Sequence, residues 1–243
     1  MKNFIVVHTF YREIEDIVFE CKNLELARIK LAFWRNDVLK LAYGKPDHPV
    51  LVLLQKNAVD IETLQEFLLK IIDGFEQVAV SPHFETFEDV TIHWMRTAGV
   101  RELLLMEWVK KENRVSTEIL YQMMMLIEMV YHVQHLRLYV RHDLVCFSED
   151  EMNRFGVTRE MLQQYVTTDS IKNLLRYQAE KIRKAYAVLE SLSRKQRALL
   201  SYWVVRCEMA YAVFREIEKS DFRVLEELTV LTPLRCWWIR FRG

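Results

Sequence analysis

Glycine and proline, the residues that most often end helices, occur only five and four times in the 243 residues of this chain. Their average use is about 7% and 5%. Apolar residues recur every three or four positions over long stretches, for example from Leu24 to Leu41, and no long stretch alternates between apolar and polar residues as a half-buried strand would. The sequence therefore predicts an all-α protein with few turns between long helices.

The periodic segments and the residues that break them predict a single domain over residues 1–243, because nothing in this length demands a second core. Gly44 and Pro46 end one predicted helix, and Pro49 begins a short one. The predicted helices span 9–22, 23–43, a short segment from 49, 61–77, 86–111, 115–140, 158–165, 169–190 and 194–218. FSEDEMNRFGVT is predicted as a loop, and the residues after 220 as a short extended or helical tail.

Charge and cysteine usage narrow the class of protein. Basic and acidic residues balance at 34 each, so we expect no nucleic-acid partner. Cys21, Cys146, Cys207 and Cys236 lack C-x-x-C spacing, which favours reduced thiols over a zinc site or disulfides. The first ten residues contain an apolar run too short for a secretion signal, and no uncharged stretch approaches the roughly 20 residues of a membrane span. A cytoplasmic protein, soluble or peripheral to a membrane, is expected.

The segment at residues 8–38, HTFYREIEDIVFECKNLELARIKLAFWRNDV, places an acidic turn before an aromatic and basic helix. This order resembles the squalene and phytoene synthase family, in which an F-C-R-x-x-D-D-x-x-D turn precedes an L-x-W-W-R-x-E-L helix. Other segments are similar to the family pattern in the same order, and they are GKPDHPVLVLL, LLKIIDGFEQ, FETFEDVTIHWMRTAG, FSEDEMNRFGVTREML and YAVFREIEKSDFRVLEELTVLTPLR. The resemblance covers nearly the whole chain.

The resemblance implies an antiparallel helical bundle of the isoprenoid synthase type around a central apolar cavity. Two acidic motifs face each other across the mouth of that cavity in the family. There, Mg²⁺ bridges the motifs to prenyl diphosphates, and the enzyme joins two prenyl chains head to head into squalene or phytoene. The resemblance thus implies a prenyl-diphosphate transferase, with Mg²⁺ as its cofactor and an isoprenoid as its ligand.

The first acidic motif is half kept. Glu15 and Asp16 stand at the leading acids of the family motif, whereas Phe19 replaces its last aspartate. Asp16 and Glu20, one helical turn apart, form an alternative pair of oxygen ligands suited to magnesium. Glu15, Asp16 and Glu20 are therefore the candidate metal ligands and catalytic residues here. The competing interpretation is a solvated acidic edge that pairs with neighbouring basic residues.

The second acidic motif, R-D-x-x-x-D, falls on Gln134, His135 and Tyr139, and neither aspartate is present. His135 and Tyr139 are the catalytic-site candidates on this side. His132, His135, Tyr139 and His142 recur near one helix face. That arrangement suits either a transition-metal site or histidines that fill a partly polar groove.

Further side chains are candidates for substrate contact, since methionines adapt to a flexible prenyl chain and arginines bind phosphates. The candidates are Arg12, Trp34, Arg35, Met125, Met129, Arg137 and Arg141. The same residues also suit a core helix and a charged surface. The C-terminal LRCWWIRFRG suits either a membrane interface or a tail that folds back onto the bundle.

Two functions from different classes remain open. The chain is either a divergent prenyl-diphosphate transferase or a non-catalytic relative that binds lipid or serves as an assembly factor, as family members in respiratory-complex assembly do. The absent second motif favours impaired catalysis. A thin cavity wall would expose apolar surface, which a protein partner, a second copy or lipid would cover.

Overall fold

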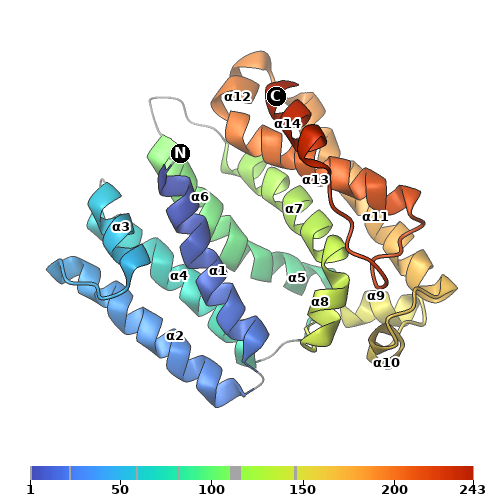
Figure 1. Cartoon of the computed structure of the whole chain (residues 1–243), viewed down its shortest axis with the longest axis horizontal. Coiled ribbons are helices and arrows are strands. Elements are labelled where there is room, and N and C mark those ends of the chain that lie inside the picture. Colours follow the sequence, from blue (N-terminus) through green and yellow to red (C-terminus); the bar gives the residue numbers. More distant parts are fainter. Residues whose placement is uncertain are drawn as a thin grey trace. The chain divides into compact units, whose positions relative to one another are not determined.

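A computed structural model describes residues 2–21, 23–58, 60–80, 83–109, 116–144 and 147–242. All regular structure within these ranges is helical (Figure 1), so the all-α prediction is confirmed. The chain forms two compact units, one from Met1–His83 with Thr91–Arg114 and one from Phe84–Val90 with Val115–Gly243. The expected single domain with a central cavity stays a prediction.

The first unit contains α1 (Lys2–Glu20), α2 (Leu24–Leu39), α3 (Pro49–Asn57), α4 (Ile61–Val80) and α6 (Val100–Val109). α1 packs against α3, α4 and α6, while α2 packs against α4. Their facing sides bury large apolar residues, among them Phe10, Ile14, Leu31, Leu68 and Ile72. Burial of such side chains is the main stabilising term for this unit.

A buried carboxylate, that of Asp37, organises the turn after α2. It accepts hydrogen bonds from the backbone N–H groups of Asp47 and His48, both at 2.8 Å. Burial alone would raise the pKa of Asp37, but these bonds and Lys40 outweigh it, and the pKa is lowered. The ionised side chain therefore fixes the path of the chain between α2, its 3₁₀ extension Lys40–Tyr43, and α3.

The predicted helix over 86–111 is divided, because a π-helical turn, Met95–Gly99, separates α5 (Phe87–Trp94) from α6. This turn packs against α4 at Gly74. A Cβ atom at Gly74 would lie 2.7 Å from Thr97 Cγ2 and 2.9 Å from the carbonyl oxygen of Arg96. Glycine at this position therefore permits a close approach that a side chain would prevent.

The second unit contains the helices from α7 onward, and α7 packs against α11 and α13. These helices are α7 (Thr117–Gln134), α8 (Leu136–Arg141), α9 (Glu149–Arg154), α10 (Arg159–Gln163), α11 (Asp169–Ser191), α12 (Arg194–Leu199), α13 (Ser201–Lys219) and α14 (Pro233–Arg242). Met123, Trp203 and Phe214 are fully buried among them.

Several predicted boundaries were wrong. α1 begins at Lys2 rather than at residue 9, and the predicted helix over 115–140 is interrupted at His135, where φ is −100° and ψ is 17°. The predicted helix over 194–218 breaks at Leu200. The predicted FSEDEMNRFGVT loop contains α9, whose first residue Glu149 donates its N–H to the carbonyl oxygen of Phe84 at 2.9 Å. None of these changes involves a glycine or proline, so tertiary packing decided them.

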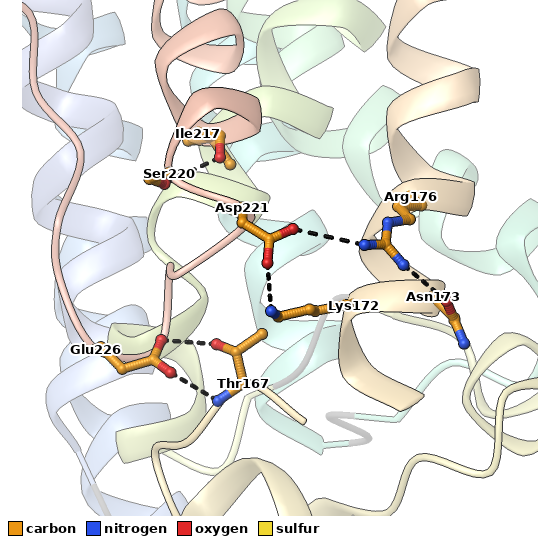
Figure 2. A network of polar contacts seen from close by, with 8 residues as sticks. All are labelled: Thr167, Lys172, Asn173, Arg176, Ile217, Ser220, Asp221 and Glu226. Atoms are coloured by element: carbon orange, nitrogen blue, oxygen red, sulfur yellow. Dashed lines mark hydrogen bonds and ion pairs between the residues drawn. The ribbon is translucent and has the colours of Figure 1, made fainter. Parts of the chain in front are cut away.

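The segment after α13 folds back onto its own unit through polar contacts (Figure 2). Asp221 and Phe222 both adopt left-handed backbone conformations, with φ of 54° and 59°. Asp221 pairs with Lys172 and, at 3.5 Å, with Arg176 on α11. The expected tail is therefore a fixed part of the second unit.

Cys21, Cys207 and Cys236 form no disulfide with one another, whereas Cys146 lies outside the described residues. None of the helices in the described ranges combines the length and the apolar character needed to cross a membrane.

Candidate functional site

The acidic turn predicted in the first unit lies near the end of α1, and Arg12 neutralises part of it. Arg12 Nη1 is 2.5 Å from Glu15 Oε2, and its Nη2 is 3.6 Å from Asp16 Oδ1. Glu15 is buried, Asp16 is about half exposed and Glu20 is exposed. The contact with Arg12 is the one that the competing interpretation, an acidic edge paired with basic residues, predicts.

In the family, the donors of the first acidic motif form one side of a magnesium clamp. The Glu15 carboxylate is paired with the Arg12 guanidinium, and this pairing competes with coordination of a metal ion. Within the described residues, no group of three or more His, Cys, Asp or Glu side chains is placed to hold a metal ion. Asp16 and Glu20 as ligands of a diphosphate-bound Mg²⁺ stay a prediction.

The aromatic and basic residues of α2 contact other residues of the first unit. Trp34 is 5% exposed, and its ring centre lies 5.3 Å from that of Phe10 and 4.2 Å from that of His48. Arg35 Nη2 lies 2.6 Å from Asp73 Oδ1 and 2.7 Å from Glu76 Oε2 on α4. Burial lowers the pKa of Arg35, but the two carboxylates outweigh it and the pKa is raised. Both side chains thus link helices, and their roles in substrate binding stay predictions.

A buried ion pair beside α1 was not anticipated from the sequence. Arg101 Nε and Nη2 lie 2.8 Å and 2.7 Å from Glu102 Oε1, and the Arg101 guanidinium lies 4.2 Å from the Tyr11 ring centre. The side chain of Glu102 has no solvent exposure and that of Arg101 has 6%. Adjacent opposite charges in a helix usually indicate a solvated surface, so the sequence carried no signal of this burial.

The second predicted site forms a cluster of imidazole and phenol rings at the junction of α7 and α8. His132 stacks on Tyr139 with ring centres 4.6 Å apart, and Tyr131 lies 4.2 Å from His135 and 6.4 Å from Tyr139. The rings of His135 and Tyr139 therefore both lie near Tyr131, and their catalytic roles stay predictions. Tyr131, one helical turn before His135, joins the same cluster.

Burial keeps the His132 imidazole of this cluster neutral, and both His132 and His135 contact backbone carbonyl oxygens. His132 Nδ1 is 2.7 Å from the carbonyl oxygen of Glu128, and His135 Nδ1 is 2.9 Å from that of Tyr131. Burial lowers the pKa of His132 to about 4, although Glu128 opposes this shift. The His132 imidazole is thus neutral at pH 7, and the two motif positions, His135 and Tyr139, carry no carboxylate.

The buried His132 leads to a prediction about pH. Its folded-state pKa of about 4 lies below the ordinary value of 6.5, so its contribution to stability is complete above pH 6.5 and is lost as the pH falls through 4. As the pH falls from 6.5 to 4, we expect the free energy of unfolding of the wild type to decrease by about 3 kcal/mol more than that of His132→Gln. Urea unfolding at pH 7.5, 5.5 and 4 would measure it, with the exposed-site variant His83→Gln as the control. If the stability of the wild type and of His132→Gln depended equally on pH, the lowered pKa of His132 would be contradicted.

An apolar pocket of about 260 Å³ opens beside this cluster, between α7, α13 and the C-terminal segment. Tyr131 and Gln134 supply polar atoms at its wall. The lining residues are Ile127, Val130, Tyr131, Gln134, Met209, Ala210, Val213, Val230, Leu231 and Cys236. The predicted chain-binding residues are not among them, since Met125 is half-buried and Met129 is buried elsewhere on α7.

The two remaining candidates for phosphate contact lie at α8. Arg137 Nη1 donates to the carbonyl oxygen of Glu226 at 2.7 Å, and its guanidinium lies 5.3 Å from the Tyr165 ring centre. Glu226 also accepts hydrogen bonds from the backbone N–H and hydroxyl of Thr167 (Figure 2). Arg137 therefore contributes to fixing the C-terminal segment, whereas Arg141 is exposed.

A family model and a solved structure match this chain over almost its whole length. The family model for squalene/phytoene synthase matches residues 2–236, and no curated protein matches the sequence. Among solved structures, a dehydrosqualene synthase in complex with ligand is similar to the chain with a TM-score of 0.77. The match covers 99% of this chain and 84% of that one at 14% identity. This likeness confirms the isoprenoid-synthase type of helical fold.

Proposed function

Because the chain belongs to the squalene/phytoene synthase family, we propose that it binds an isoprenoid, either a prenyl diphosphate or a related lipid, and that its head-to-head prenyl transfer is strongly impaired. The pocket between α7 and α13 is the observation that carries this proposal. Its lining is almost entirely aliphatic, with a phenol and an amide at the wall, as is usual in sites for apolar ligands with a polar end.

The size of the pocket favours one chain over two. Its volume of about 260 Å³ lies just below the usual range of about 300–1,000 Å³ for small-molecule sites. Head-to-head transfer requires two prenyl chains side by side, whereas this space suits part of one. Lipid binding without efficient condensation is thus the function that the second unit supports best.

The charges around the two motif positions support impaired catalysis. In the first unit, Arg12 forms ion pairs with the carboxylates of Glu15 and Asp16. In the second unit, His135 and Tyr139 stand where the family motif has its two aspartates. Ionisation of a diphosphate requires cationic groups or metal ions that stabilise the leaving charge, and the only cation among these five side chains, Arg12, is already paired with Glu15 and Asp16. The expected cavity between the helices of Asp16 and His135 stays a prediction.

A second candidate function, that of a non-catalytic assembly factor, is favoured by the surface of α2. Leu26, Ile29 and Phe33 are 46%, 67% and 53% exposed and follow one another at helical spacing. An exposed apolar stripe of this kind is typical of a contact with another protein chain. The partner would be another protein or a second copy, and the protein would work in the cytoplasm at the surface of a membrane.

Filling the pocket tests lipid binding. Ala210→Phe places a ring in the pocket and is expected to weaken binding of farnesyl diphosphate and farnesol at least about tenfold, as measured by isothermal titration calorimetry. Ala212→Phe adds the same ring to another face of α13 and serves as the matched control, with thermal unfolding as the check on folding. Unchanged affinity in Ala210→Phe, or no isoprenoid binding by the wild type, would refute the assignment of this pocket.

A further inference from the structure

The C-terminal helix α14 exposes its apolar face. Leu234, Trp237, Trp238 and Phe241 are 79%, 55%, 52% and 72% exposed. They occupy positions i, i+3, i+4 and i+7, which lie on one side of a helix. Helices on a globular protein normally turn such a stripe toward the core, so the orientation of α14 is the reverse of the usual one.

The opposite side of α14 is attached to the second unit. Arg235 forms an ion pair with Glu216 on α13, and Cys236 lines the apolar pocket. The hydrogen bonds from Arg235 and Lys219 lower the pKa of Glu216 to about 2. The side of the helix that contacts the protein therefore carries the charged Arg235 together with Cys236, and this attachment leaves the aromatic face outward.

The charge of this segment indicates what covers that face. Residues 233–243 contain Arg235, Arg240 and Arg242 and no acidic residue. Tryptophan and phenylalanine flanked by arginine are typical of helices that lie in the interface of a bilayer, where the rings enter the headgroup region and the cations meet anionic lipids. A symmetric contact with a second copy would instead bring the basic residues of two helices together.

We propose that α14 binds the surface of an anionic lipid bilayer through Leu234, Trp237, Trp238 and Phe241, with Arg240 toward the headgroups. This inference deepens the proposed function, because the pocket lined by Cys236 lies directly behind α14 and its isoprenoid ligand would come from the same bilayer. Membrane binding by α14 does not require a ligand in the pocket. Either proposal can therefore be refuted while the other holds.

Vesicle binding tests the proposal with the whole chain. Sedimentation with phosphatidylcholine vesicles, with and without phosphatidylglycerol, would compare the wild type with Trp237→Ser/Phe241→Ser. We expect at least about tenfold weaker binding in this variant. Arg240→Glu should weaken binding to anionic vesicles about fivefold or more and leave neutral vesicles unaffected. Phe33→Ser, a similarly exposed aromatic residue on α2, is the matched control and should bind as the wild type does.

A second measurement does not depend on any variant. Brominated lipids should quench the tryptophan fluorescence of the wild type on binding, because Trp237 and Trp238 are far more exposed than Trp34, Trp94 and Trp203. Equal vesicle binding by Trp237→Ser/Phe241→Ser and the wild type would overturn the proposal. Loss of binding in Phe33→Ser alone would also overturn it, as would self-association that depends on Trp237 and Phe241 without vesicle binding. Ala210→Phe should lose ligand but still bind vesicles.

Discussion

With Mg²⁺ and farnesyl or geranylgeranyl diphosphate, the purified protein is expected to form squalene or phytoene at least about a thousandfold more slowly than an active dehydrosqualene synthase assayed beside it. A diphosphate leaves with about three negative charges, which metal ions and cations must stabilise from both sides. Here Arg12 already binds Glu15 and Asp16, and His135 and Tyr139 are poor magnesium ligands. A thousandfold loss corresponds to about 4 kcal/mol of transition-state stabilisation.

Radiolabelled substrate followed by organic extraction would measure the product, and the active enzyme is the positive control. His135→Asp/Tyr139→Asp should raise turnover, since it returns both missing carboxylates. Tyr139 is 3% exposed and stacks on His132, so circular dichroism must show that this variant folds. His135→Asp, at a less buried position, separates the effect of charge from that of folding. Efficient product formation by the unmodified protein would show that the second motif was misplaced.

The sequence predicted the fold class and the two candidate regions for particular reasons. Scarce glycine and proline together with helical periodicity are sufficient to predict an all-α chain, and one-turn spacing placed His135 and Tyr139 in one cluster. Helix breaks at His135 and Leu200 could not be predicted, because neither residue is a strong helix breaker and tertiary packing sets the break.

The sequence also could not predict which face of α7 lines the pocket. Ile127 and Val130 line it, whereas Met125 and Met129 do not. The helix is apolar around most of its circumference, so its pattern does not tell which side meets α13 and which meets α11. Only the packing of the second unit resolves this choice. The same limit applies to Arg101 and Glu102, whose burial depends on the position of α1 and not on their own segment.

Replacing Glu102 with alanine is expected to lower the free energy of unfolding by about 3–5 kcal/mol, because it removes a buried carboxylate that pairs with the buried Arg101 guanidinium. Glu66→Ala breaks an exposed pair with Lys70 on α4 and, as the matched control, should cost less than about 1 kcal/mol.

The decisive variant for this ion pair removes both charges. Arg101→Met/Glu102→Leu should be clearly more stable than Glu102→Ala, since two apolar side chains of similar size need no compensating partner. Some loss relative to the wild type is expected, because the contact between Arg101 and the Tyr11 ring disappears as well. Urea unfolding at pH 7 of these variants and the wild type measures each difference. If Glu102→Ala cost no more than Glu66→Ala, the pair would behave as a solvated one, and its burial beside α1 would be incorrect.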